Sequence, residues 1–377
     1  MNSGSLITIS DFENNFPDEL ERELENLYHN PFATLAHHRH YCDLRRGVHA
    51  YVARSAKGDM LAALLWRREG HVARVLNEQI GLAAQEVGRF AQHVFSTQED
   101  IDVIELHAVH AERPRLPFPA QHFDCAEDIV LPLPESVEAY RASLGKSTRS
   151  YLCRYMNKLR RDYPDMRHEV IERENISEDQ VRRIVALNHA RMQGRHRASY
   201  IDDAEVTRML DMTRRYGLLT QVRIDGRVCA GAIQLQIGDH YFLQVIAHDC
   251  AFNDYGLGTL CCYLAICECI ARGGEEYHFL WGRYPYKVRL LGRQRKLQHI
   301  ALYRDRTRFA LHGRLAAANA WRALRFRNHD WLLDHLHQPD LLGASLRAAA
   351  QGARAVRGML QFSRAGEHGA GSHQKAG

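Results

Sequence analysis

The fold is decided by residues 218–287, LLTQVRIDGRVCAGAIQLQIGDHYFLQVIAHDCAFNDYGLGTLCCYLAICECIARGGEEYHFLWGRYPYK. Three apolar runs are separated by turns at Asp225-Gly226 and Gly238-Asp239, which predicts a three-strand antiparallel meander. Tyr255–Thr259 then leads into an apolar helix, and a short strand precedes Tyr284–Lys287. Helix N-termini present free N–H groups, and glycine lets a backbone approach an anion closely. This stretch therefore suits binding the pyrophosphate of a nucleotide-like cofactor.

An earlier region, residues 47–106, has the same order of expected elements. Three strand-like runs between Val48 and Leu76 precede a helical pattern over Leu82–Phe95 and a buried strand over Ile101–Leu106. We infer a tandem duplication of one α/β unit. The first copy has Asn77–Gly81 where the second has its two glycines, so a cofactor phosphate is expected in the second copy.

Five prolines between Pro114 and Pro134 predict a connecting loop and edge segment over residues 112–135, because helices do not tolerate that density. We therefore place a domain boundary near Pro134. The expected divisions are an N-terminal domain over 1–134, a second domain over 135–303, a helical extension over 304–364 and a disordered tail over 365–377.

Composition excludes several classes of protein. With 45% hydrophobic and 25% charged residues, the 377-residue chain is expected to be globular, with room for two domains. No segment approaches the roughly 20 apolar residues that span a bilayer, and the acidic start is unlike a targeting signal, so we expect a cytoplasmic protein. The nine cysteines contain no C-x-x-C pair, and we expect no metal.

Residues 141–161 carry seven basic side chains and no acidic one, and their apolar residues recur at helical spacing. The expected amphipathic helix has several open interpretations. Its cations could contact the phosphates of a cofactor, an acidic polysaccharide or nucleic acid, or they could form an ordinary solvated face.

Four features of Arg141–Arg293 together resemble the GNAT-type acetyltransferase domain of cellulose-biosynthesis (CelD/BcsL-like) proteins, near the FemAB-like branch. They are Lys146-Ser147-Thr148-Arg149, the Asp225-Gly226 hairpin followed by Ala230-Gly231-Ala232, Ala247-His248-Asp249 before Tyr255-x-x-Gly258-Thr259, and Gly282-Arg283-Tyr284-Pro285-Tyr286-Lys287.

The resemblance implies an α/β (α+β) fold of tandem GNAT-like domains, the first degenerate, each a mixed, mostly antiparallel sheet flanked by helices. The second sheet would splay open between its fourth and fifth strands and hold an acyl-CoA there. Backbone groups of Gln244, Val245 and Ile246 would pair with the pantetheine arm. The pyrophosphate would lie on the segment that contains Tyr255, Gly256, Gly258 and Thr259, which carries Asn253 and Asp254 where the family has glutamine or arginine.

Acyl transfer requires a base for the acceptor, stabilisation of an oxyanion and a proton for the departing thiolate. His248 and Asp249, at the end of the fourth strand, are candidate bases. Tyr286 is a candidate acid, and Lys287 a candidate for binding an anion. A polar strand end and aromatic packing explain these residues equally well. Lys146 and Arg149 are candidate substrate-binding residues.

The expected function is acyl-CoA-dependent N- or O-acyl transfer, with acetyl-CoA as the expected donor and no metal. The acceptor would be a sugar, amino sugar or other small molecule, in polysaccharide biosynthesis. Homo-oligomerisation stays open, and nucleic acid is not the expected partner. The alternatives are a FemAB-like aminoacyl-tRNA-dependent ligase or RNA-binding protein, and a catalytically inactive GNAT scaffold.

Overall fold

The computed structural model describes residues 7–111, 116–194, 199 and 201–336. The chain divides into two compact units, Met1–Gly313 and Arg314–Gly377. The first unit contains both expected repeats, and the second begins with most of α11 (Gly313–Leu336). The predicted tail and residues 337–364 of the predicted helical extension lie outside the described residues.

The first repeat follows the predicted order of strands and helix. Its elements are β1 (Thr8–Glu13), α1 (Glu19–Tyr28), η1 (Pro31–Ala33), α2 (Leu35–Tyr41), β2 (Val48–Arg54), β3 (Met60–Glu69), β4 (Val72–Val75), β5 (Gly81–Leu82), α3 (Ala84–Thr97), β6 (Val103–Ala111) and β7 (Ala120–Pro132). The strands β4 and β6 are parallel and are joined through α3, as a crossover requires.

The second repeat has the same topology, preceded by extra helices. Its elements are α4 (Val137–Ser143), α5 (Lys146–Asp162), β8 (Arg167–Glu172), η2 (Arg173–Asn175), α6 (Glu178–Gln193), α7 (Asp203–Tyr216), β9 (Gly217–Ile224), β10 (Arg227–Ile237), β11 (His240–His248), η3 (Cys250–Tyr255), α8 (Leu257–Ala271), β12 (Glu276–His278), α9 (Pro285–Arg289), β13 (Arg293–Tyr303) and α10 (Arg306–Leu311). The predicted meander is β9–β10–β11. Asp225 and Gly226 both have positive φ, as a tight hairpin turn demands.

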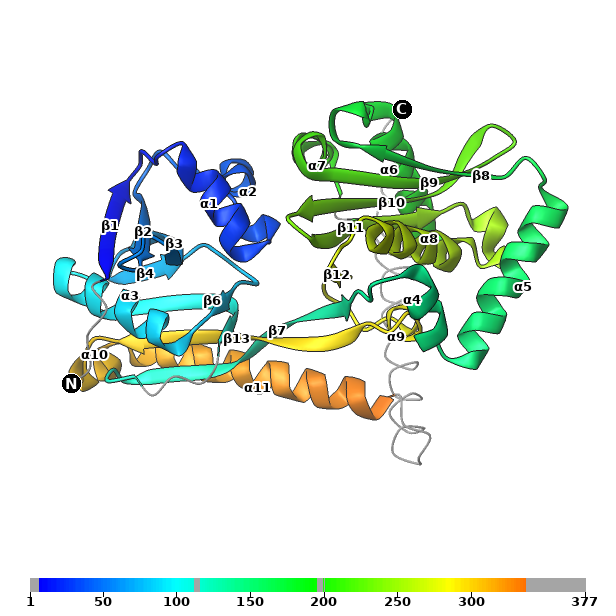
Figure 1. Cartoon of the computed structure of the whole chain (residues 1–377). Coiled ribbons are helices and arrows are strands. Elements are labelled where there is room, and N and C mark those ends of the chain that lie inside the picture. Colours follow the sequence, from blue (N-terminus) through cyan, green and yellow to red (C-terminus); the bar gives the residue numbers. More distant parts are fainter. Residues whose placement is uncertain (1–6, 112–115, 195–198, 200, 337–377) are drawn as a thin grey trace, which may run out of the picture. The chain divides into compact units, whose positions relative to one another are not determined.

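The two repeats exchange their last strands. Within the described residues, one 13-stranded sheet runs in the order β1-β2-β3-β4-β6-β13-β7-β12-β11-β10-β9-β8, with β5 pairing with β6. Thus β13 of the second repeat pairs with β6 of the first, β7 of the first pairs with β12 of the second, and β7 and β13 pair with each other (Figure 1).

The prediction of a loop and edge segment over residues 112–135 is therefore wrong for β7, which lies inside the sheet between β13 and β12. Three of the five prolines precede this strand, Pro132 is its last residue and Pro134 follows it. No proline removes an N–H from the interior of the ladder, so the strand tolerates them. The division near Pro134 stays a prediction.

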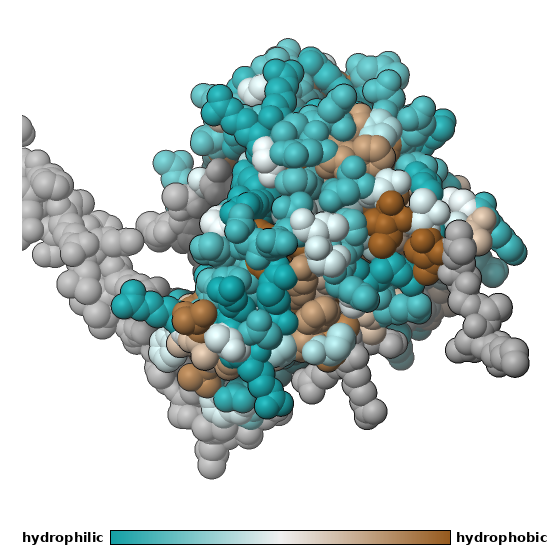
Figure 2. Space-filling model, turned by 90° about the vertical axis from the view of Figure 1, so that its left-hand side faces the viewer, coloured by the Kyte–Doolittle hydropathy of each residue, from teal (hydrophilic) through white to brown (hydrophobic). Residues whose placement is uncertain are grey.

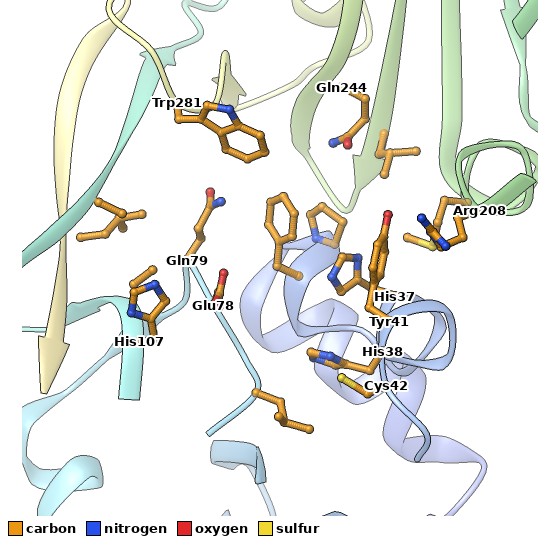
Figure 3. A pocket seen from close by; sticks show the side chains of 18 of the residues that line it. His37, His38, Tyr41, Cys42, Glu78, Gln79, His107, Arg208, Gln244 and Trp281 are labelled. Carbon is orange, nitrogen blue, oxygen red and sulfur yellow. The ribbon is translucent and has the colours of Figure 1, made fainter. Parts of the chain in front are cut away.

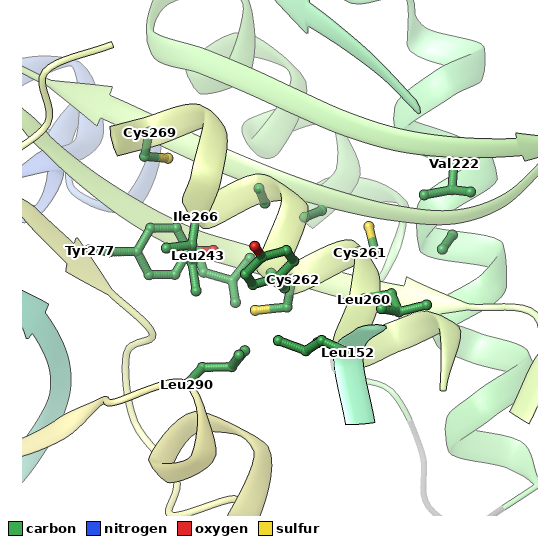
Figure 4. Close-up of a cluster of buried hydrophobic side chains, with 14 of the residues drawn as sticks. Leu152, Val222, Leu243, Leu260, Cys261, Cys262, Ile266, Cys269, Tyr277 and Leu290 are labelled. Atoms are coloured by element: carbon green, nitrogen blue, oxygen red, sulfur yellow. The ribbon is translucent and has the colours of Figure 1, made fainter. Parts of the chain in front are cut away.

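Helices cover both faces of each half of the sheet (Figure 1). In the first repeat, α3 packs on one face, and α1 and α2 pack on the other. In the second, α4, α5 and α8 share one apolar cluster, part of which is shown in Figure 4, while α6 and α7 pack on the opposite face. The predicted α/β class with mostly antiparallel sheets is confirmed.

No helix in the described part of the chain has the length and apolar character to span a bilayer. On the face shown in Figure 2, hydrophilic residues predominate and hydrophobic ones lie in small groups between them.

Candidate functional site

The sheet opens where β11 leaves β12. Only His240, Tyr241 and Phe242 of β11 pair with β12, which ends at His278. Beyond Phe242, the described sheet gives β11 a paired neighbour on one side only, β10. The edge of β11 that contains Gln244, Val245 and Ile246 therefore borders the opening.

A β-bulge lies at the start of this opening. Ile233 pairs with Val245 and Gln234 pairs with Leu243, so Gln244 is the extra residue. Bulges redirect a side chain and occur often beside active sites. The Nε2 atom of Gln244 is buried and has no hydrogen-bond partner among the described residues.

The glycine-bearing segment forms a compact turn at the end of β11. Asp249 caps η3 by accepting a hydrogen bond from Ala251 N at 3.0 Å, and Gly256 adopts a φ of 59°. A Cβ on Gly256 would lie 2.1 Å from the Tyr151 hydroxyl, and one on Gly258 would lie 2.5 Å from His248 Nδ1. Close packing thus requires glycine at both positions, whatever the segment binds.

The start of α8 offers few free donors. The N–H groups of Thr259 and Leu260 both donate to Gly256 O, at 3.0 and 3.1 Å. Among the described residues, the N–H groups of Leu257 and Gly258 have no backbone acceptor and form the positive end of the helix, where Leu257 is buried and Gly258 is partly exposed.

The basic helix α5 packs against this segment. It begins at Lys146, because the predicted helix over 141–161 breaks at Leu144 and Gly145. Lys158 Nζ lies 4.3 Å from the centroid of the Tyr255 ring and donates to Asp254 O at 3.4 Å. The positive charge near the turn therefore comes from α5 and not from residues 253 and 254.

The two candidate substrate-binding residues lie at the start of α5. Arg149 Nη1 donates to Ala142 O at 2.6 Å and to Leu144 O at 2.9 Å, which ties α5 to the end of α4. Lys146 is exposed. These contacts give Arg149 a structural role alongside any role in binding.

The four candidate catalytic residues fall in two places. His248 and Asp249 lie beside the turn, and the His248 Nε2 atom is 2.8 Å from Asn253 Oδ1. Tyr286 packs into the apolar cluster on the α8 side, where burial raises the pKa of its phenol and keeps it protonated. Lys287 is 3% exposed, and burial lowers its pKa to about 8.

All three N–H donors of the Lys287 ammonium are used inside the fold. They bond to the carbonyls of Phe279, Leu280 and Trp281 at 2.8, 3.0 and 2.6 Å. Lys287 thus holds the strand that leaves β12 on the far side of the opening.

A buried ion network fixes the closed end of the opening. His278 Nδ1 lies 2.6 Å from Asp128 Oδ2, and Arg295 donates twice to Glu276, at 2.6 and 2.9 Å. Burial lowers the pKa of His278, but its hydrogen bonds to Asp128 and Glu276 outweigh burial and raise the pKa overall.

A cavity of about 760 Å³ adjoins the opening, between the two repeats. Gln244 and Trp281, from the two sides of the opening, both line it (Figure 3). The first repeat contributes residues of α2, of the segment between β4 and α3 and of β6, and the second contributes residues of α7 and β10. Such a cavity holds a molecule of drug or sugar size.

Residues 146–288 match the acetyltransferase (GNAT) domain family. The matched GNAT domain contains α5, the meander, the turn, α8 and β12, and it stops within α9. It supports an enzyme of the acyltransferase class, and no curated protein matches the chain.

Solved structures share the architecture at low identity. FemX aligns with a TM-score of 0.54 at 8% identity, over 80% of this chain and 99% of that chain, and shows the fold alone. A conserved protein of unknown function from Bacteroides thetaiotaomicron VPI-5482 aligns with a TM-score of 0.49 at 10% identity, over 79% of this chain and 100% of that chain. A tandem GNAT protein from the clavulanic acid biosynthesis pathway aligns with a TM-score of 0.40 at 12% identity, over 79% of this chain and 98% of that chain.

Sequence reasoning missed the cavity residues Glu78, Gln79, Arg208 and Trp281. The one sequence feature that could have indicated any of them is the position of Glu78 and Gln79 within the first repeat. Glu78 and Gln79 occupy, in the first repeat, the strand-to-helix segment that corresponds to the glycine-bearing turn of the GNAT domain.

Proposed function

We propose that the protein is an acyl-CoA-dependent N- or O-acyltransferase that uses acetyl-CoA and acts on a sugar, amino sugar or other small acceptor. The observation that carries this proposal is the opening between β11 and β12, because Gln244 and Trp281 on its two sides also line a cavity of acceptor size. A role in polysaccharide biosynthesis, as in CelD/BcsL-like proteins, belongs to the same proposal.

In this proposal the pantetheine arm lies along the unpaired edge of β11, where Gln244, Val245 and Ile246 supply backbone donors and acceptors. The pyrophosphate lies at the N-terminal end of α8, at the partly exposed Gly258, near Lys158. An acceptor in the cavity attacks the thioester carbonyl directly, and a backbone N–H of β11 stabilises the oxyanion. The Tyr286 hydroxyl, kept protonated by burial, donates a proton to the departing thiolate.

Isothermal titration with acetyl-CoA tests the donor. We expect saturable binding that weakens when Gly258 is replaced by valine, since the new side chain would displace His248 at the turn. Gly81→Val is the matched control, because Gly81, like Gly258, lacks a positive φ, and a Cβ there meets nothing within 4 Å. Absence of binding at millimolar acetyl-CoA would overturn the proposal and favour the inactive scaffold.

One observation favours a second function, a FemAB-like aminoacyl-tRNA-dependent ligase. Several cations of α5 point to solvent, namely Arg154, Arg160 and Arg161. RNA held by these cations would dissociate steeply with added salt, with a slope set by the number of phosphate contacts. Binding of acetyl-CoA without binding of tRNA would exclude this second function.

A further inference from the structure

The charged side chains that line the cavity are balanced, with one exception. Arg208 pairs with Glu205 at 2.7 Å, Arg74 pairs with Glu69 at 3.0 Å and with Glu105 at 3.3 Å, and Glu127 accepts from Arg283 at 2.8 Å. Burial lowers the pKa of two lining histidines, to about 3 for His37 and about 4 for His38, so both are neutral at pH 7.

Glu78 is the exception. Among the described residues its carboxylate has no hydrogen bond and no ion pair, and burial raises its pKa. Its backbone is nevertheless fixed, because the buried Asn30 donates to Glu78 O at 3.1 Å and to Gln79 O at 2.8 Å. Glu78 is partly buried, and a carboxylate that has lost part of its water is unfavourable unless something compensates it; here the open side is the cavity.

Two amide groups near Glu78 also lack partners. Gln79 holds a φ of 56°, which is rare for a residue other than glycine, and its Oε1 atom is buried without a hydrogen bond. Across the cavity, Gln244 Nε2 is likewise buried and unbonded (Figure 3). The described lining thus combines a carboxylate that has no partner with two amide groups that each contain a buried polar atom without a hydrogen bond.

We propose that Glu78 is a catalytic carboxylate, which binds a protonated amine of the acceptor and takes its proton. This inference rests on the proposed function, and it specifies that the acyl group is transferred to a nitrogen and not to an oxygen of the acceptor. The ammonium loses one proton to Glu78, and the resulting amine attacks the thioester carbonyl. The C–S bond then breaks as the C–N bond is completed. The thiolate takes one proton from the Tyr286 hydroxyl. Tyr286 then takes a proton from the new amide nitrogen, and Glu78 releases its proton to solvent.

The first repeat then has a function of its own. Its strand-to-helix segment carries a carboxylate where that of the GNAT domain carries glycines, so it binds a cation where the other binds phosphate. A bound ammonium also restores the ionised form of Glu78 that burial disfavours.

The test uses matched probes that differ only in the amine, glucosamine against glucose and putrescine against 1,4-butanediol. Saturation-transfer NMR measures their binding, and release of CoA from acetyl-CoA measures transfer. We expect the amines to bind and react in preference to the alcohols. Glu78→Gln should lower kcat/KM for the amines by about 100-fold or more, since general bases contribute about 10²–10⁴-fold. The exposed Glu174→Gln variant receives the same chemical change as a control.

The outcomes separate the two proposals. A wild-type protein that binds no acetyl-CoA overturns the proposed function, and the NMR comparison still tests Glu78. A wild-type protein that binds acetyl-CoA but prefers no amine overturns the assignment of Glu78. So does a Glu78→Gln variant that keeps full amine binding and transfer. Unchanged acetyl-CoA affinity in Glu78→Gln is required, because it shows that the variant is folded.

Discussion

Replacing Gly256 by alanine should lower the free energy of unfolding by about 2–5 kcal/mol, from two separate causes. The left-handed backbone at φ 59° costs an L-residue about 1–2 kcal/mol. The added Cβ would also lie 2.1 Å from the Tyr151 hydroxyl, and overpacking of this kind costs about 1–3 kcal/mol. Urea unfolding measures the sum, as a shift of the midpoint at constant m-value.

A matched glycine isolates the second cause. Gly226 has a φ of 71°, and a Cβ there meets nothing within 4 Å, so Gly226→Ala should lose only about 1–2 kcal/mol. Tyr151→Phe should reduce the extra loss at Gly256, because the nearest remaining ring atom would lie at 2.9 Å. Equal losses for the two alanine variants, with no effect of Tyr151→Phe, would refute the packing explanation.

Three further predictions concern buried polar groups and are measured by the same unfolding experiment. Lys287→Met should lower stability by about 3 kcal/mol or more, because three carbonyls lose their charged donor; a loss below 1 kcal/mol would contradict this. Arg304→Met should lose about 2–4 kcal/mol, since Arg304 donates to the carbonyls of Phe95, Gln98 and Ile101 at the end of α3. The folded-state pKa of His278 is raised, so its contribution is complete below the unfolded pKa near 6.5 and is lost as pH rises through the folded pKa. The stability difference between wild type and His278→Gln should therefore shrink as the pH is raised from 6, and a constant difference would contradict the assigned pKa.

Local patterns made much of the GNAT domain predictable. The Asp225-Gly226 turn and the three apolar runs of the meander each depend on neighbours in the sequence, and each predicted element is present as β9 to β11. The β-bulge at Gln244 was not predictable, because it is a difference in register between two strands and leaves no mark on either one.

The cavity was beyond sequence reasoning for a related reason. Its walls come from α2, the segment before α3, α7 and the segment after β12, which meet only in the folded chain. Glu78 looks like an ordinary surface residue in the sequence, and only the fold shows that no cation of the described residues pairs with it. Lys287 looked like a residue for binding an anion, whereas its charge is satisfied by three carbonyls of its own chain.

The exchange of β7 and β13 has a consequence for synthesis on the ribosome. The strand that completes the first repeat is β13, Arg293–Tyr303. The ribosome therefore adds nearly two hundred residues after β6 before the strand that pairs with it is made. Until then its edge is an open template for pairing with other nascent chains. Neither half can be expressed alone with its sheet complete. A truncation before Arg293 should therefore yield aggregates, whereas separately encoded halves should recover a native sheet only when they are produced together.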